Sequence, residues 1–363
     1  MNLRIPGPTP LPPEVVQAMQ RPMINHRGVA FVGLQNKLIA NLQQVFQTSN
    51  ELFILPGSGS GGLEAAIVNV ISPGDRVLAC VAGSFGERFA QIATAFGAQV
   101  EKLIFPQGTA IDPDHVAARL RAVPDTRVVL ITHSETSTGI LHPVQAIAQT
   151  VHENSNALVL VDAVSSLGAA PLATDAWGLD VVVTGSQKAL MSPPGAAILS
   201  IGERAWQAYA QARAPRFFWD WQQWKKWVAQ GQTPFTPPLE IYYALDAALD
   251  LLLAEGLPNV YARHERLARF TRERVAAIGF QLFPDPRFAS PTVTAVRPPD
   301  GVEASALIRR ARDEFGVEFA GGQGELKGKL LRIGHLGYVH EPEIRQALDV
   351  LAQVLKLTQL VTA

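Results

Sequence analysis

The sequence predicts an α/β fold built around a mostly parallel sheet, followed by a smaller α+β domain. Short β-rich runs alternate with longer segments of helical period between residues 52 and 200. The runs 159–161 and 181–183 are continuously apolar, which is typical of strands covered on both faces. Turn-forming Gly, Ser, Pro or Asp residues punctuate the runs. Seven strands are predicted: Leu52–Leu55, Arg76–Cys80, Gln99–Leu103, Arg127–Thr132, Ala157–Asp162, Val181–Thr184 and Ala196–Ser200.

Length and a change of pattern predict more than one domain. The chain has 363 residues, 47% of them hydrophobic, which is enough for a sizeable core. A helical stretch from Ala244 ends at the break formed by residues 256–258. We therefore predict an N-terminal arm over 1–20, a large domain over 21–256 and a small domain over 257–363. The small domain is expected to contain helices near 264–278 and 304–315, strands near 292–296 and 330–333, and a final helix from Glu341.

Composition narrows the possible partners. The formal net charge is −1 without any run of like charges, so neither nucleic acid nor a membrane surface is expected as a partner. A single cysteine, Cys80, excludes an internal disulfide framework and a multi-cysteine metal site within one chain. The N-terminus has no apolar signal-like run, and no later segment is long and apolar enough to span a membrane. We expect a cytoplasmic protein that acts on a small molecule.

Lys188 and Asp162 carry the prediction of chemistry. Lys188 follows a predicted strand, and open α/β sheets bind their ligands at the carboxyl ends of strands. Asp162 ends a very apolar strand, where an acid is costly unless it is paired. A protonated pyridine nitrogen would pair with this acid, and a partly desolvated lysine can attack an aldehyde. A solvated lysine and a helix-capping aspartate are the alternatives, but capping does not explain Lys188. The pair predicts pyridoxal 5′-phosphate (PLP), held by Lys188 as a Schiff base.

A glycine and serine loop over residues 57–62 separates the first predicted strand from a strongly helical segment. Such a loop suits a phosphate, because glycines allow close approach and the helix N-terminus offers free N–H groups. The loop also matches the dinucleotide-binding pattern G-x-G-x-x-G. That alternative requires an acid at the end of the second strand, but Asp75 precedes the strand, which ends at Cys80. The dinucleotide-binding interpretation therefore lacks the acid that would bind the ribose hydroxyls.

Further candidates follow other strands at the same edge of the sheet. The hydroxyl-rich loop 133–139 could reach a phenolic oxygen or a phosphate, and Phe85 could stack on a flat ring or belong to the core. Arg332 lies inside an apolar strand of the small domain. An inward guanidinium would clamp a substrate carboxylate, whereas an edge position would expose it to water.

These residues together resemble the class V aminotransferases of PLP fold type I, in particular the alanine–glyoxylate, serine–glyoxylate and serine–pyruvate branch. The resemblance runs nearly end to end. Its strongest segments are 160–168 and 185–190, with 193–195 behind them. Weaker segments in the same order are 6–8, 135–139 and 331–334.

The resemblance implies a homodimer with active sites at the interface, and transamination of alanine or serine with glyoxylate or pyruvate. Lys188 would be the catalytic lysine. The implied cofactor-binding residues are Ser58, Gly59, Ser60, Phe85, Ser137, Asp162, Val164, Gln187, Thr233 and Thr236. The implied substrate-binding residues are Pro6, Gly7, His26, Arg27 and Arg332.

Several residues differ from the family pattern, so the sequence does not decide which substrate is used or which residues contact the cofactor phosphate. Thr233 stands where the animal enzymes place a tyrosine from the neighbouring subunit, whereas Thr236 is retained. Phe85 is a smaller platform than the tryptophan of those enzymes. A His-Arg pair like His26 and Arg27 lies near the substrate's phosphate in phosphoserine aminotransferases and also occurs in serine–glyoxylate enzymes. A phosphoserine aminotransferase and a polar loop without substrate contact are therefore alternatives.

Two rivals come from other classes. Similar cyanobacterial chains carry the label of a soluble hydrogenase small subunit, but one cysteine and eight histidines scattered singly offer no nickel–iron or cluster ligand set. The aromatic and basic segment 216–227 has the composition of nucleic-acid or membrane-binding segments. Given the nearly neutral chain, we predict instead that it is buried in a core or a dimer interface.

Overall fold

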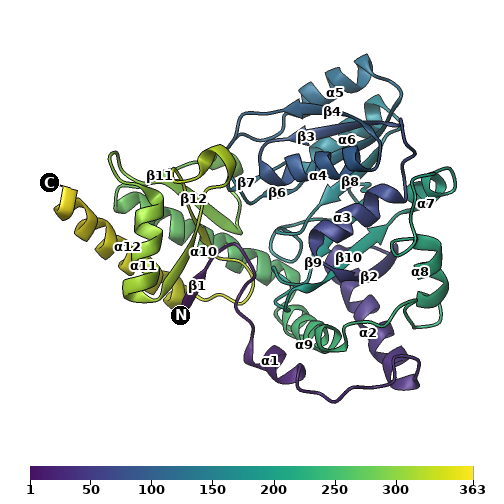
Figure 1. The fold of residues 1–363 in the computed structure, drawn as a ribbon, viewed down its shortest axis with the longest axis horizontal. Coiled ribbons are helices and arrows are strands. Elements are labelled where there is room, and N and C mark those ends of the chain that lie inside the picture. Colours follow the sequence, from purple (N-terminus) through teal and green to yellow (C-terminus); the bar gives the residue numbers. More distant parts are fainter. Residues whose placement is uncertain (363) are drawn as a thin grey trace.

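The computed structural model describes residues 1–362 and arranges them around two main sheets (Figure 1). The larger sheet has seven strands in the order β2-β10-β9-β8-β5-β3-β4. β10 runs antiparallel to both neighbours, and the other neighbouring pairs are parallel. The predicted sheet is therefore confirmed, with strand ends within two residues of those expected. Its strands are β2 Glu51–Gly57, β3 Arg76–Val81, β4 Gln99–Ile104, β5 Thr126–Thr132, β8 Leu158–Asp162, β9 Val181–Gly185 and β10 Gly195–Ile201.

Helices cover both faces of this sheet. One apolar core lies between the strands and a first set of helices: α2 Val29–Phe46, α5 Pro113–Ala122, α6 Val144–Asn154 and α9 Leu239–Glu255. The other core lies beneath a second set: α3 Gly59–Val68, α4 Ser84–Ala95, α7 Glu203–Tyr209 and α8 Trp221–Val228. Leu158 and Leu160 of β8 enter the second core, whereas Val159 and Val161 enter the first. This alternation explains why the strand is apolar throughout.

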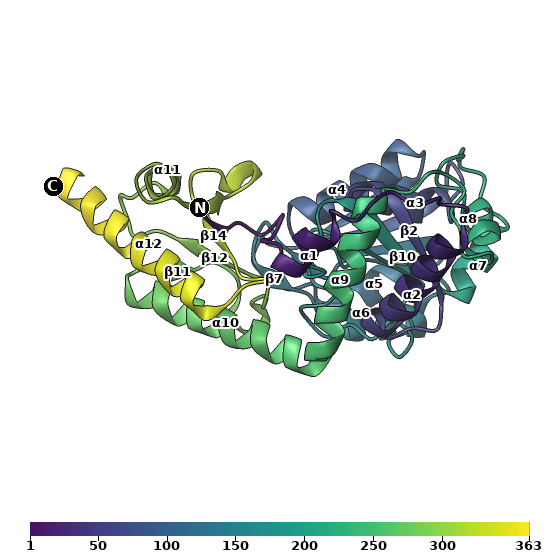
Figure 2. The same ribbon diagram turned by 90° about the horizontal axis from the view of Figure 1, so that it is seen from below.

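The smaller sheet has five strands in the order β1-β13-β14-β12-β11 and lies beside the larger one (Figure 2). Its strands are β1 Asn2–Arg4, β11 Gln281–Leu282, β12 Val293–Arg297, β13 Val317–Gly321 and β14 Leu331–Gly334. The accompanying helices are α10 Leu257–Ala277, α11 Ala304–Phe315 and α12 Glu341–Thr362. β1 pairs in parallel with β13, so the first residues of the chain belong to the sheet formed by its last third. Neither strand was predicted, because β1 is too short to show a period and β13 follows α11 after a single glycine.

The chain passes from the large sheet to the small one through consecutive helices. α9 begins at Leu239, five residues before the predicted start, and ends at Glu255. Gly256 takes a left-handed φ of 82°, and α10 starts at the next residue. Pro258 lies in the first turn of α10, where a missing N–H leaves no bond unmade. No helix among residues 1–362 has the length and apolar character needed to cross a membrane.

Candidate functional site

Lys188 and Asp162 lie at the carboxyl ends of two neighbouring parallel strands. Asp162 is the last residue of β8 and is paired with Val183 of β9, and Lys188 follows three residues after β9 ends. Each charge acts on the other, because Lys188 lowers the pKa of Asp162 and Asp162 raises that of Lys188. Within the described chain, however, no ion pair joins the two side chains. The amine and the acid are thus close enough to interact electrostatically but are held apart.

Asp162 is an enclosed carboxylate with little support from the protein. Its side chain is 4% exposed, and its Oδ1 accepts a hydrogen bond from the backbone N–H of Val164 at 3.0 Å. The pKa of Asp162 is raised to about 6, chiefly by burial and also by the charge of Glu135, while the hydrogen bond from Val164 opposes the shift. Lys188 and Arg88 also lower this pKa through their charges. A cationic group placed against Asp162 would remove most of its desolvation penalty.

Lys188 is enclosed between the end of β9 and the N-terminal arm. Burial, and then the charge of Arg332, lowers the pKa of its amine to about 8. Its Nζ donates a hydrogen bond to the backbone carbonyl of Pro6 at 2.5 Å. A Cβ at Gly7 would lie 2.6 Å from Nζ, so only glycine leaves room for the amine here. The arm is held by Thr9, whose hydroxyl donates to the carbonyl of Lys188 at 3.1 Å.

The predicted phosphate loop lies where β2 passes into α3. Ser58 is the exposed N-cap residue of α3, and Gly59 is the first residue of the helix. A Cβ at Gly59 would lie 2.6 Å from Cγ2 of Val164, so the loop approaches the segment after Asp162 closely. The Oε1 atom of Gln187 is enclosed and has no hydrogen-bond partner within residues 1–362. The free N–H groups at the start of α3 suit an anion such as a phosphate, whereas the unpaired oxygen of Gln187 requires a hydrogen-bond donor.

Glu135 is a buried residue that the sequence analysis did not single out. Its carboxylate accepts hydrogen bonds from the backbone N–H groups of Phe85 and Gly86, both at 3.0 Å. It also accepts from the hydroxyl of Ser137. One carboxylate therefore binds the N-terminus of α4 and sets the backbone from which Phe85 projects. An acid in an otherwise hydroxyl-rich loop was the available signal.

Two neighbouring hydroxyls in this loop point to different surroundings. Ser137 Oγ donates to Glu135 and accepts from the backbone N–H of Ser84 at 3.0 Å. Thr136 Oγ1 instead lies 2.5 Å from Oγ of Ser165, which follows the Asp162–Val164 segment. The hydroxyl of Ser137, predicted to bond the cofactor's phenolic oxygen, is thus already engaged on the α4 side.

Arg332 on β14 connects the small sheet to the site. Its side chain is 6% exposed, with Nε donating to the carbonyl of Gly321 at 2.8 Å and Nη1 to that of Thr136 at 3.0 Å. Burial lowers the pKa of Arg332 to about 10, and the charge of Glu135 opposes this shift. The guanidinium faces inward rather than toward water, and its charge acts on Lys188. The inward orientation considered for Arg332 is the one that the structure has.

His26 is half-buried and precedes Arg27, which contacts the loop that carries Thr233 and Thr236. Arg27 donates to the carbonyl of Thr233 at 2.5 Å and stacks on the ring of Trp227, with its guanidinium carbon 4.1 Å from the ring centroid. The hydroxyl of Thr233 donates to the carbonyl of Phe235 at 2.7 Å, and Thr236 is exposed. In this chain Arg27 therefore braces the loop that carries the two threonines.

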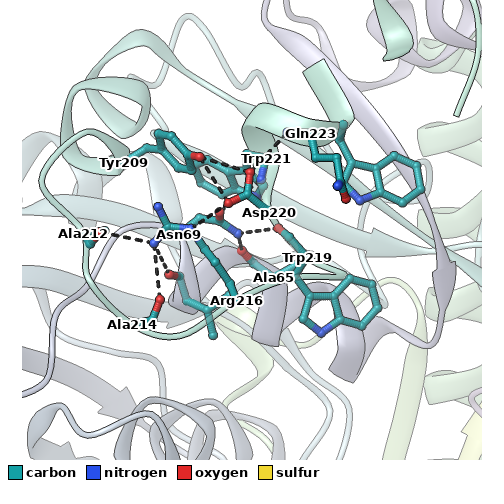
Figure 3. Close-up of polar contacts among 12 residues, drawn as sticks. Ala65, Asn69, Tyr209, Ala212, Ala214, Arg216, Trp219, Asp220, Trp221 and Gln223 are labelled. Atoms are coloured by element: carbon teal, nitrogen blue, oxygen red, sulfur yellow. Dashed lines mark hydrogen bonds and ion pairs between the residues drawn. The ribbon is translucent and has the colours of Figure 1, made fainter. Parts of the chain in front are cut away.

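The aromatic segment before this loop is fastened to α3 by polar side chains (Figure 3). Asn69 at the end of α3 donates to the carbonyl of Trp219 at 2.7 Å and accepts from the N–H of Trp221 at 3.1 Å. Asp220 caps α8 and accepts from the hydroxyl of Tyr209, and Arg216 pairs with it. Trp221 and Trp224 are fully buried, which agrees with the predicted core role for part of this segment.

Trp219 brings the same segment to the glycine loop. Its ring lies 3.4 Å and 3.3 Å from where a Cβ would stand at Gly57 and Gly61. Its indole N–H donates to Glu64 at 3.2 Å. The hydrogen bonds from Asn69 and to Glu64 therefore hold the indole ring of Trp219 against the loop predicted to bind a phosphate.

The groups collected at this sheet edge fit PLP. An unpaired buried acid suits a pyridine N–H, a lysine of lowered pKa suits an aldehyde, and the start of α3 suits a phosphate. The buried Oε1 atom of Gln187, the residue before Lys188, lacks a hydrogen-bond partner within residues 1–362, as expected where a bound ligand supplies one. Fold and site together define a PLP enzyme of fold type I.

Comparison with known proteins identifies the family. The family model described as aminotransferase class-V matches residues 1–324, and the chain belongs to this family. A crystal structure of alanine–glyoxylate aminotransferase from Nostoc sp. superposes with a TM-score of 0.94 at 35% identity, covering 97% of this chain and 94% of that one. The protein is thus a PLP-dependent aminotransferase, as the sequence predicted, and the fold-class and cofactor predictions are confirmed.

Two relatives carry different names. The "Soluble hydrogenase, small subunit" of Synechococcus sp. (strain PCC 6716) is 42% identical over 97% of this chain and 92% of its own length. The L-aspartate–glyoxylate aminotransferase of Paracoccus denitrificans (strain Pd 1222) is 38% identical over 92% of this chain and 85% of its own length. Among the described residues, no three His, Cys, Asp or Glu side chains come together in a metal-binding arrangement.

Proposed function

We propose that this aminotransferase moves the amino group of a small amino acid, alanine or serine, to glyoxylate or pyruvate. The observation that carries the proposal is the buried, inward guanidinium of Arg332, whose charge acts on the amine of Lys188. A bidentate contact with a substrate carboxylate there would bring Cα close to the lysine. The names of the similar alanine–glyoxylate and aspartate–glyoxylate enzymes support glyoxylate as the acceptor.

Each residue of the site has a proposed role. Asp162 would pair with the pyridine nitrogen, and Lys188 would hold the aldehyde carbon. Ser58, Gly59, Ser60 and Gln187 would bind the phosphate, with Phe85 and Val164 on the two faces of the ring. Because the hydroxyl of Ser137 is engaged with Glu135, we assign the contact with the phenolic oxygen to Thr136 instead. When bound, PLP supplies an electron sink that acidifies the Cα–H bond of the substrate.

Lys188 would move the proton in this reaction. A lysine whose pKa is near 8 has an appreciable neutral fraction close to neutral pH, so its Nζ would accept the proton from the substrate Cα and deliver it to C4′ of the cofactor. Arg332 helps by lowering that pKa and by fixing the carboxylate. The Pro6 carbonyl gives Nζ a defined resting position.

We further propose a homodimer in which Arg27 and the loop that it braces serve the partner's site. Large apolar side chains are exposed on this part of the surface, including Phe217 at 73% and Val29 at 89%. Both lie near this group, because the ring of Phe217 is 6.0 Å from that of Phe235, next to Thr236, and Val29 is two residues from Arg27. A partner subunit would cover such exposed apolar side chains. Thr236 would then reach the phosphate bound by the other subunit, while Arg27 and Thr233 hold the loop in place.

A spectral titration of the purified PLP-loaded enzyme tests the substrate assignment. Alanine, serine, aspartate and phosphoserine are added separately, and loss of the cofactor's long-wavelength absorbance is followed. Glyoxylate and pyruvate are then added to restore it. We expect alanine or serine to give kcat/KM about a hundredfold above phosphoserine, because a site without a matched phosphate contact gains nothing from that charge. A preference for phosphoserine would contradict the proposal and favour His26 and Arg27 as its ligands.

Lys188→Ala tests the catalytic assignment, with the exposed Lys226→Ala as the matched control. The first variant should lose the absorbance band of covalently held cofactor and all measurable transamination. The control should keep both. Transamination retained in Lys188→Ala would remove Lys188 from the mechanism.

A further inference from the structure

A second hollow, away from the strand ends of the large sheet, lies where β1 meets α12. Its volume is 510 Å³, and its lining includes Asn2, Arg4, Phe315, Tyr338, Glu343 and Gln346. Arg4 and Asn2 belong to β1, and Glu343 lies in the first turn of α12. None of these residues has a role in the transamination described above.

Arg4 is buried there without the partners that a guanidinium needs. It is 3% exposed, and its Nε and Nη1 atoms have no hydrogen-bond partner within residues 1–362. Burial lowers the pKa of Arg4 to about 10, and the charge of Glu343 opposes this shift. No ion pair joins Arg4 to Glu343 in the described chain, so these opposite charges stand apart across the lining. A guanidinium left without acceptors carries a full desolvation penalty.

An acceptor on the same lining is also unpaired. The amide nitrogen of Asn2 donates to the carbonyl of Glu343 at 2.7 Å and to Oε1 of Gln346 at 3.1 Å. The Oδ1 atom of Asn2 is enclosed and has no partner within residues 1–362. The carboxylate of Glu343 accepts only one bond there, from the N–H of His340 at 3.2 Å. The lining therefore carries unpaired donors on Arg4, an unpaired acceptor on Asn2 and the half-buried carboxylate of Glu343.

We propose that this hollow binds the zwitterionic head of a free α-amino acid. The ligand's carboxylate would accept from Arg4, and its ammonium group would donate to Glu343 and to Oδ1 of Asn2. A simple anion would satisfy Arg4 alone, and a simple amine would satisfy only the acceptors. A molecule that carries both charges a few ångströms apart matches the whole set.

Such a site lies on the arm that contacts the catalytic lysine. Arg4 is two residues from Pro6, whose carbonyl accepts the hydrogen bond from Lys188. The intervening Ile5 is held tightly, since a Cβ at Gly334 would lie 2.1 Å from its carbonyl oxygen. A ligand in the hollow would therefore fasten the same arm.

Calorimetric titration of the PLP-loaded enzyme tests the proposal. The probe is 2-methylalanine, which lacks a Cα hydrogen and cannot complete transamination. Cofactor absorbance, recorded in parallel, counts occupancy of the active site. For wild-type protein, calorimetry should show one more equivalent of 2-methylalanine bound per chain than the absorbance change assigns to the active site. Arg4→Met should lose that equivalent with its absorbance titration unchanged, whereas exposed Arg309→Met should behave as wild type.

Two further arms define the ligand class. Glu343→Gln, which removes a charge near the surface, should weaken the extra equivalent about tenfold for 2-methylalanine, consistent with loss of one charged contact. Acetate and methylamine should each bind the hollow more weakly than 2-methylalanine. Equal stoichiometry in wild type and Arg4→Met would overturn the site. Acetate binding as tightly as the amino acid, and indifferent to Glu343→Gln, would overturn the zwitterion assignment.

Discussion

Two buried aspartates at opposite ends of the neighbouring strands β8 and β9 have very different partners. Asp162 ends β8 and Asp180 precedes β9, and they are 4% and 5% exposed. Burial raises the pKa of both. Asp180 is compensated, because it accepts from the N–H of Val159 at 2.7 Å and pairs with Arg204 at 3.1 Å. Asp162 has a single backbone bond and no ion pair within the described chain.

The comparison distinguishes Asp180, whose charge is neutralised within the protein, from Asp162, whose charge is available to a ligand. Arg204 also donates to the carbonyls of Asn156 and Ala157, so it ties together the starts of two strands. At the other end of these strands the charge of Lys188 acts on Asp162, and the charge of Arg332 acts on Lys188, without a direct ion pair between them within the described chain. Arg204 neutralises Asp180, so this end of the strands has a structural role. Asp162 has no such partner within the described chain, so the other end of the strands can bind a cationic group of a ligand.

The largest expected effect is that of Asp162→Asn. The asparagine can still accept from Val164 but cannot stabilise a pyridinium, so kcat/KM should fall about 10²–10³-fold, the size seen when one transition-state partner is lost. Steady-state kinetics measures this. Asp180→Asn is the matched control and should change kcat/KM by less than about threefold. Comparable losses in both variants would break the distinction between the two acids.

The same substitution should stabilise the cofactor-free protein. The folded pKa of Asp162, about 6, exceeds its unfolded value of 3.8, so its favourable contribution is present below pH 3.8 and is lost as the pH rises through 6. At pH 8 the ionised acid therefore costs stability, and Asp162→Asn should raise the free energy of unfolding by about 3 kcal/mol. Urea denaturation at pH 8 checks the sign. A less stable variant would contradict the unpaired state of Asp162.

Arg204→Met should act in the opposite sense. It leaves Asp180 buried without its partner, which costs about 2–3 kcal/mol after allowance for an arginine side chain that is 39% exposed. Thermal denaturation should show the loss, while kcat/KM stays within about twofold at a temperature where the variant is folded. A large kinetic defect without loss of stability would mean that Arg204 and Asp180 also contribute to the reaction.

Glu135→Gln should have a smaller effect. An amide in place of the carboxylate is a poorer acceptor for the N–H groups of Phe85 and Gly86, so the start of α4 should loosen and PLP affinity should fall about tenfold. Fluorescence titration of the apoenzyme with PLP measures this. The exposed Glu240→Gln is the control. Unchanged affinity would remove Glu135 from the list of residues that prepare the site.

The smallest effect concerns the pH dependence of cofactor attachment. With a pKa of about 8, the neutral fraction of Lys188 falls about fivefold between pH 8 and pH 7. The rate of PLP attachment to the apoenzyme should follow this fraction and level off above about pH 9. A lysine of ordinary pKa would instead show a rate still rising tenfold per pH unit at pH 9. Stopped-flow absorbance distinguishes the two curves.

Much of the fold was predictable because its signals are local. Continuous apolar runs identified the strands of the large sheet, and the period of residues 304–315 identified α11 with its observed bounds. β1 and β13 were missed because neither shows a clear local signal, and their pairing joins residues more than three hundred positions apart. Lys188 and Asp162 were found because a strand end restricts where a side chain lies. Glu135 was missed, because its importance comes from the N–H groups at the start of α4, about fifty residues earlier in the chain.

The sequence by itself determined the alternation of strands and helices, the family, and the presence of an acid and an amine at neighbouring strand ends. These follow from residue period and from the cost of placing charge after an apolar run, which are properties of short segments. Only the tertiary structure decided which charges are paired. It gave Asp180 an arginine and Asp162 none, engaged Ser137 with Glu135, and set Arg4 apart from Glu343. Pairing depends on distances of a few ångströms between segments far apart in the chain, and no local pattern encodes them.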